Sequence, residues 1–223
     1  MSAYEVSILM LTHGAFKYTH KTLSTLQKTK DVSYETVVVD NLSGNILKHF
    51  LIRWQAKGWL DKLCFLNYNS LFAEGNNIAS RLADQNSKYY LLLNSDVEIH
   101  DPLWLRKLID KHEKGMTSYG LVRDNPITRV DGYCLLIDSD LYRKHQLSSD
   151  YQWWWSVTKL QAEVLNDGHT VKGFEEHEDQ VHHFGGKSGQ DFRKAKGLQT
   201  DPQEIVGWFN GKSVKALNSI DDA

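Results

Sequence analysis

Polar side chains follow four short apolar segments in the first 100 residues. These groups are Thr12-His13, Asp40-Asn41, Asn67-Tyr68-Asn69 and Asn94-Ser95-Asp96. If the apolar segments are parallel strands of one sheet, the groups meet beyond its carboxyl edge, where such sheets bind their ligands. Carboxylates, amides and hydroxyls gathered there could bind a polar ligand.

Two familiar motifs almost match the second half of the chain. Gly185-Gly186-Lys187-Ser188 resembles the end of a phosphate-binding P-loop, but that loop needs a glycine where Val181 stands. Residues 177–182 resemble the zinc-protease helix, but the second histidine comes one residue too late for both imidazoles to share a helix face. We therefore predict neither a P-loop nor a zinc-protease site.

The first half alternates strand and helix patterns, which predicts a mostly parallel α/β sheet with helices on both faces. Residues 6–11 form a continuous apolar run of the kind found in buried parallel strands. The predicted strands are residues 6–11, 36–39, 63–66 and 89–93, and the predicted helices are residues 16–29, 46–59 and 74–85.

The second half gives a less regular pattern. The predicted helices are residues 103–114, 153–166 and 203–209, and the predicted strands are residues 130–137, 170–174 and 180–184. No linker rich in proline, glycine or serine separates the halves. We therefore predict a single domain over residues 1–223, with one lobe up to residue 110 and a smaller lobe from 111 to 223.

Composition excludes several classes of protein. The formal net charge of −2 over 223 residues argues against a nucleic-acid partner. No apolar run approaches the roughly 18 residues that span a membrane, and the N-terminal residues lack the pattern of a signal peptide. The two cysteines, Cys64 and Cys134, stand in apolar strand-like runs, as is typical of a reducing compartment. We expect a cytoplasmic protein.

Four segments carry a resemblance to a known family. They are residues 7–12, 38–43, 69–77 and 92–96. In this order and spacing, over roughly the first 110 residues, they resemble the nucleotide-sugar-binding half of family 2 glycosyltransferases. The resemblance implies the GT-A fold, with a donor-binding first half and a small C-terminal acceptor lobe. It also implies transfer of a hexose from a UDP-sugar to a saccharide or other hydroxyl acceptor, with Mn²⁺ or Mg²⁺ as cofactor.

The implied metal site lies at the end of the fourth strand. A divalent cation bridges the oxygens of a nucleoside diphosphate and stabilises the charge that develops on it as it leaves. In the resembled family an Asp-x-Asp motif supplies oxygen ligands, and here its two ends are Asn94 and Asp96. The resemblance implies Asp96 as the metal ligand, with Asn94 and Ser95 at the donor. A cap of a turn is the alternative for Asp96.

The implied nucleotide site uses the first two strand ends and the third helix. Asp40 would accept a hydrogen bond from the ring N–H of uracil, with Thr12 and Asn41 beside it. Asn76 and Asn77 would open a helix whose free N–H groups and positive dipole end face the sugar or diphosphate. Simple helix capping is the alternative for each asparagine.

A late segment, residues 181–188, resembles the part of the family in which a strand-end histidine completes the metal site. Neutral imidazole is a good ligand for Mn²⁺. Side chains alternate along a strand, so only one of His182 and His183 can face the site, and we predict His182. Lys187 and Ser188 would then contact the diphosphate.

The acceptor side departs from the family pattern. Aromatic faces pack on sugars, so Trp153-Trp154-Trp155 could bind an acceptor, although tryptophans are more often core residues. In the family an acidic pair near the start of this helix deprotonates the acceptor hydroxyl, and here Ser156 and Val157 occupy those positions. Neither side chain is a usable base. We predict Asp150, just upstream, as the catalytic base.

Other interpretations stay open. A later acid, Glu175, Glu176, Glu178 or Asp179, could be the base, or the donor's own phosphate could take the proton in a retaining reaction. The chain could also be a catalytically impaired module that binds nucleotide-sugars or glycans. A sugar nucleotidyltransferase is disfavoured, because Thr12-His13-Gly14-Ala15 lacks the glycines and the basic residue of that loop.

Overall fold

The structure is a computed structural model that describes residues 4–187 and 197–221. Its strands are β1 (Val6–Thr12), β2 (Tyr34–Asn41), β3 (Lys62–Leu66), β4 (Tyr89–Leu93), β5 (Val97–Ile99), β6 (Gly115–Ser118), β7 (Leu121–Val122), β8 (Arg129–Val130), β9 (Cys134–Asp138), β10 (Thr170–Glu176), β11 (Val181–His183) and β12 (Lys215–Ser219). Its helices are α1 (Phe16–Leu26), α2 (Asn45–Ala56), α3 (Leu71–Leu82), α4 (Trp104–Asp110), α5 (Ser139–His145), α6 (Trp154–Asn166) and α7 (Pro202–Trp208).

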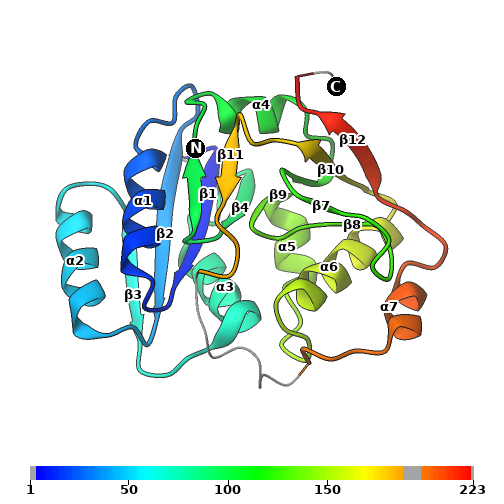
Figure 1. The fold of residues 1–223 in the computed structure, drawn as a ribbon, viewed down its shortest axis with the longest axis horizontal. Helices are drawn as coiled ribbons and strands as arrows, with labels where there is room; N and C mark the ends of the chain where they lie inside the picture. The colour runs from blue at the N-terminus through cyan, green and yellow to red at the C-terminus, as the bar shows by residue number, and fades with distance from the viewer. Residues whose placement is uncertain (1–3, 188–196, 222–223) are drawn as a thin grey trace.

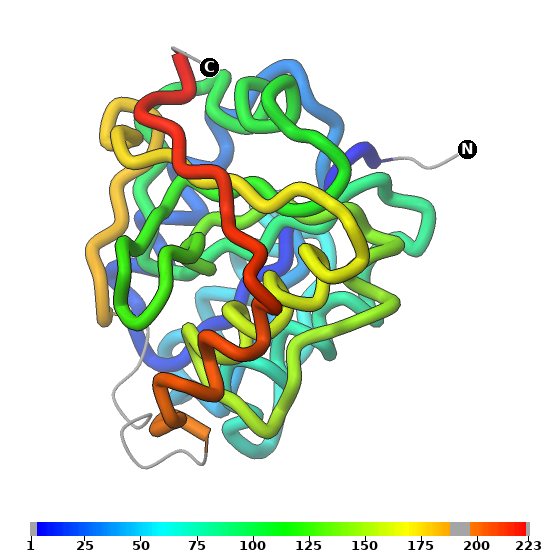
Figure 2. The backbone as a smooth tube through the Cα atoms, turned by 90° about the vertical axis from the view of Figure 1, so that its right-hand side faces the viewer, coloured from blue at the N-terminus to red at the C-terminus, as the bar shows by residue number. Residues whose placement is uncertain are grey.

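One eight-stranded sheet runs through the molecule in the order β12-β10-β6-β9-β4-β1-β2-β3 (Figure 1). Strand β9 is antiparallel to both of its neighbours, and every other pair is parallel. Strands from the first half of the chain form one side of the sheet and strands from the second half form the other. The final strand, β12, pairs with β10 at the far edge (Figure 2). The sheet is therefore continuous across the boundary predicted at residue 110.

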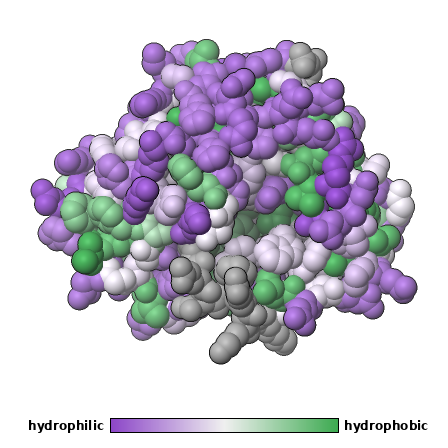
Figure 3. Space-filling view, viewed as in Figure 1, coloured by the Kyte–Doolittle hydropathy of each residue, from purple (hydrophilic) through white to green (hydrophobic). Residues whose placement is uncertain are grey.

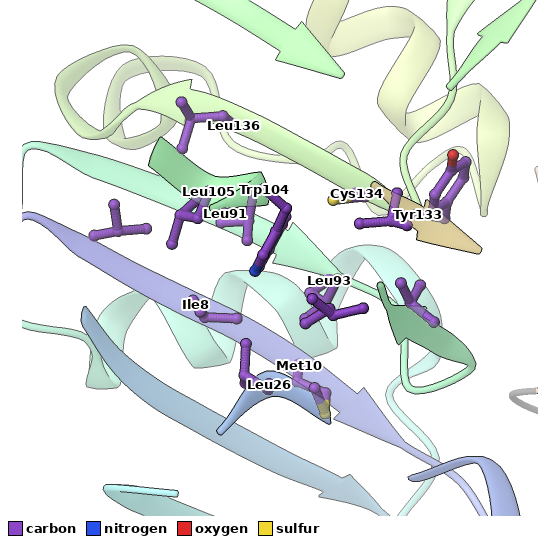
Figure 4. Packing of buried hydrophobic residues seen from close by; sticks show 14 of the residues in the cluster. Ile8, Met10, Leu26, Leu91, Leu93, Trp104, Leu105, Tyr133, Cys134 and Leu136 are labelled. Atoms are coloured by element: carbon purple, nitrogen blue, oxygen red, sulfur yellow. The ribbon is translucent and has the colours of Figure 1, made fainter. Parts of the chain in front are cut away.

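The apolar strands bury side chains on both faces of this sheet. Ile8 and Met10 of β1 pack in a cluster with residues of α1, α2 and α4, part of which is drawn in Figure 4. Leu9, between them, points into a second cluster with residues of α3, α5 and α6. Burying each such side chain contributes about 1.5–3 kcal/mol. The strand ends that carry the polar groups are thus fixed by a core on either side.

The structure differs from the predicted elements in three ways that affect the site. The helix predicted from residue 74 begins at Leu71, three residues earlier. The strand predicted over residues 130–137 is split into β8 and β9 by residues 131–133, because the N–H of Asp131 bonds the carbonyl of Gly120 instead of continuing in the large sheet. The three-residue strand β5 was not predicted, and it pairs antiparallel with β11.

Among the described residues, each helix is too short or too polar to span a bilayer.

Candidate donor and metal site

The ends of β1 and β2 meet as predicted. Thr12 lies opposite Asp40 in the parallel register, and its hydroxyl donates to Asp40 Oδ1 at 2.9 Å. The N–H of Ser43 donates to Asp40 Oδ2 at 3.1 Å. Asp40 is fully buried. Each of its oxygens keeps a second lone pair, so each could accept one further hydrogen bond.

Asn41 holds the start of α3. Its Nδ2 donates to the carbonyl of Leu71, and its Oδ1 accepts from both the N–H and the hydroxyl of Ser70. Leu71 has a φ of +59°, a conformation that a leucine adopts only when its surroundings enforce it. The amide of Asn41 therefore fixes this turn and places the next residue, Phe72, which lines the pocket described below.

Asn76 and Asn77 do not lie at a helix N-terminus, because α3 begins at Leu71. Both are buried in its second turn. The amide of Asn76 donates to the carbonyl of Phe72. Asn77 donates to the carbonyl of Leu147 and accepts from the Tyr142 hydroxyl. The predicted position of this pair at the helix opening is thus wrong, and the two side chains tie α3 to itself and to the segment around α5.

Asp96 is the buried carboxylate of the site. It has no exposed surface, and its Oδ2 accepts from the backbone N–H of Lys187 at 2.9 Å. Its Oδ1 is buried without a hydrogen-bond partner among the described residues. An unsatisfied charged oxygen inside a protein is costly. A cation at Oδ1 would remove that cost. The neighbouring Ser95 is also buried, and its hydroxyl has no partner in the described part of the chain.

His183 faces Asp96. Its Nε2 lies 3.3 Å from Asp96 Oδ1 and 3.5 Å from Asn94 Nδ2. Its ring stacks on Tyr133, with the centroids 4.2 Å apart. The backbone of Asn94 is held by the carbonyl of Tyr133. One small polar cluster therefore forms from Asn94 after β4, His183 at the end of β11 and Tyr133 just before β9.

The choice of His182 as the residue facing the site is wrong. In the antiparallel pairing of β11 with β5, His183 stands opposite Val97, the residue directly after Asp96. His182 points away and bonds Glu178 through Nδ1 at 2.6 Å. The register of β5, which the sequence did not reveal, decides between the two histidines.

Lys187 follows two glycines with positive φ, Gly185 at +66° and Gly186 at +62°. These left-handed conformations turn the chain so that the N–H of Lys187 reaches Asp96. The Lys187 residue itself is exposed. The predicted contact residue Ser188 lies outside the described residues.

A pocket of about 170 Å³ opens beside this cluster. Asn94, His183 and Gly186 line its polar side, and the aromatic rings of Phe72, Tyr133, Trp153 and Trp154 line much of the rest. Figure 3 shows this face hollowed near its centre, with pale and green atoms inside a purple surround. Trp153 has a φ of +52° and stacks on Phe72. Such a conformation costs about 1–3 kcal/mol and often accompanies a functional site.

Asp150, the predicted base, is exposed and does not line this pocket. Ser156 and Val157 are both buried in the first turns of α6, and the Ser156 hydroxyl donates to the carbonyl of Trp153. The acidic residue that does line the pocket is Asp131, in the break between β8 and β9. Sequence reasoning missed it, because the apolar run from residue 130 to 137 looked like one uninterrupted strand.

The residues present fit a divalent metal shared with a ligand. Among the described residues, no three His, Cys, Asp or Glu side chains form a complete metal cluster. Mg²⁺ is commonly held by one or two carboxylates plus substrate phosphates, and imidazole suits Mn²⁺. Asp96 Oδ1 and His183 Nε2 are 3.3 Å apart, close to the roughly 3.0 Å between adjacent ligands of an octahedral ion at about 2.1 Å. The pair could supply two adjacent ligands of such an ion, and a diphosphate could supply others.

The mostly parallel sheet flanked by helices is the GT-A fold. The family model described as "Glycosyl transferase family 2" matches residues 7–159, and the chain belongs to this family. No curated protein sequence matches the chain.

Solved structures with the same fold are distant in sequence. TarS from S. aureus, in complex with UDP, aligns at a TM-score of 0.57 and 17% identity, covering 71% of this chain and 55% of that one. Mannosyltransferase PcManGT from Pyrobaculum calidifontis, in complex with GDP-Man and Mn²⁺, aligns at 0.59 and 17%, covering 74% and 54%. GalNAc-T7, with UDP, GalNAc and Mn²⁺, aligns at 0.61 and 13%, covering 75% and 42%. The chain spans about half the length of these proteins.

Proposed function

We propose that this chain is a metal-dependent glycosyltransferase that moves a hexose from a UDP-sugar to a hydroxyl acceptor. The observation that carries the proposal is the buried Asp96. Its Oδ1 has no hydrogen-bond partner among the described residues and lies 3.3 Å from Nε2 of His183, which lines the aromatic pocket. In a GT-A fold this is the carboxyl end of β4, where a parallel sheet binds its ligand.

Asp96 and His183 would hold the Mn²⁺ or Mg²⁺. When bound, the metal stabilises negative charge on the departing diphosphate as a Lewis acid. The protein fixes this pair in advance, because the backbone of Lys187 holds one oxygen of Asp96 and the ring of Tyr133 holds the imidazole of His183. Lys187 is exposed, and its ammonium group would contact the diphosphate from the solvent side.

The nucleoside would bind over the ends of β1 and β2. Thr12 and Asp40 are already joined there by a hydrogen bond, and a free lone pair of Asp40 would accept the ring N–H of uracil. TarS was solved with UDP-GlcNAc, and PcManGT with GDP-Man. The fold thus serves more than one base, and we assign UDP from Asp40.

The acceptor would lie against the exposed part of the aromatic pocket. Trp154 is 38% exposed and lines the pocket beside Trp153. Indole faces suit the C–H faces of a sugar ring, which favours a saccharide among hydroxyl acceptors.

One observation favours a second function. The acid pair expected on α6 is replaced by Ser156 and Val157, both buried. A chain that binds the donor and lacks any base would act as a nucleotide-sugar or glycan-binding module.

Donor binding and donor turnover, measured side by side, separate these functions. We would titrate UDP-glucose, UDP-galactose, UDP-N-acetylglucosamine, UDP-N-acetylgalactosamine and GDP-mannose with Mn²⁺, and measure both binding heat and nucleotide release. The enzyme predicts tight binding and release for at least one UDP-sugar. Binding without release supports the module, and no binding of any donor contradicts both.

A further inference from the structure

The position on α6 where an acid is expected, Val157, lies beside the segment between β8 and β9. A Cβ placed on Gly132 would come within 2.7 Å of a methyl group of Val157. The first turns of α6 therefore press directly on the break between β8 and β9. The residue before Gly132 lines one pocket together with Val157, so the group at that position is a candidate for the role of the missing acid.

That group is Asp131. It lines the same pocket as Asn94 and His183 on one side and Trp153 and Trp154 on the other. The residue is half-buried. Its backbone is fixed at both ends, since its N–H donates to the carbonyl of Gly120 and its carbonyl accepts from the hydroxyl of Ser118.

The carboxylate of Asp131 is free to act on a ligand. One oxygen, Oδ1, accepts from the N–H of Gly132 at 2.7 Å, which sets its orientation. Asp131 forms no ion pair within 4.0 Å with another described residue. Its second oxygen accepts no hydrogen bond from a described residue, and Asp131 also lines a neighbouring pocket together with Arg129.

The other candidate acids stand elsewhere. Glu175 is paired with Arg123, and Glu178 with His182. Together with Glu176 and Asp179 they line a separate pocket next to Asp221. Asp150 is exposed and outside the site. Of the acids that the sequence left open, none lies in the aromatic pocket.

We propose that Asp131 is the catalytic base, moved from α6 to the adjoining turn. The inference rests on the proposed glycosyltransferase function. The Asp131 carboxylate takes the proton of the acceptor hydroxyl as the acceptor oxygen forms a bond to the anomeric carbon. The bond from that carbon to the diphosphate oxygen breaks, and its electron pair leaves with UDP. Asp131 then releases the proton to solvent. This direct displacement inverts the anomeric configuration.

Asp131→Asn tests the assignment, with Asp150→Asn as the matched control. The probes are UDP and the UDP-sugar that the wild type turns over, in Mn²⁺, with water as acceptor. General-base catalysis contributes roughly 10²–10⁴-fold, so UDP release by Asp131→Asn should fall by about that factor. Its binding of UDP and its melting temperature should match the wild type. Asp150→Asn should keep both activity and binding.

Near-normal release by Asp131→Asn would overturn the assignment, as would retention of configuration in the product determined by NMR. A loss of release in Asp150→Asn with none in Asp131→Asn would return the role to Asp150. If the wild type itself neither binds nor hydrolyses a UDP-sugar, the proposed function fails instead. The two failures are therefore distinguishable.

Discussion

The donor side and the acceptor side of the pocket are built in different ways. On the donor side, β1, β2 and β4 are buried parallel strands. The polar residues of the site stand at or just after the carboxyl end of each strand. On the acceptor side, the groups come from a strand break at Asp131 and from Trp153, whose φ is +52°. The first kind of site follows from local pattern, whereas the second depends on pairings between distant segments.

Prediction from the sequence succeeded for features set by local pattern and failed for those set by contacts between distant segments. The apolar run of β4 and the polar residues after it predicted that Asp96 follows a strand end, because both features are local. His183 could not be chosen over His182 without the register of β5, which has only three residues. Asn77 looked like a ligand residue, but Leu147 and Tyr142, some 65 to 70 residues away, use its amide.

The fold was predictable for a related reason. Seven strand and helix segments in the first half have the length and period that define them, and all seven are present with small shifts at their ends. In the second half β6, β7, α5 and β12 were missed. These elements are short. The strands among them are positioned by pairing more than by their own pattern: β6 pairs with β9 and β10, β12 with β10, and β7 with β8.

Asp96→Asn should give the largest effect on the donor side. The amide keeps the shape of the side chain but removes the charge that would hold the cation. Loss of even outer-shell support typically costs 10–100-fold in metal affinity, so loss of this ligand should exceed about 100-fold. Calorimetric titration of Mn²⁺ in the presence of UDP measures the change. An unaltered Mn²⁺ affinity would remove Asp96 from the metal site.

The two histidines provide a matched pair that tests the register of β11. His183→Ala should raise the Mn²⁺ concentration required for UDP release by about 10–100-fold. His182→Ala should change it little, since His182 bonds Glu178 on the other face. A metal titration of both variants decides the matter. The opposite order would mean that β11 presents its other face to the donor.

Asp40→Ala should give a smaller effect, a weaker binding of UDP through loss of the contact with uracil. Losing a buried hydrogen bond to uracil costs about 1–3 kcal/mol, which corresponds to roughly 5–150-fold weaker UDP binding. Removal of Asp40 also frees Thr12 and Ser43, so the melting temperature should be recorded beside the affinity. If a folded variant binds UDP as tightly as the wild type, the uracil contact is disproved.

The most direct test of the account is the metal dependence of turnover by the wild-type chain. UDP release from the best UDP-sugar should be measured in Mn²⁺, in Mg²⁺ and in excess chelator, and then again after Mn²⁺ is restored. The account predicts release with either metal, loss of release in chelator and recovery on adding Mn²⁺, because the buried Asp96 and His183 hold the diphosphate only through a cation. Full release in excess chelator would contradict it.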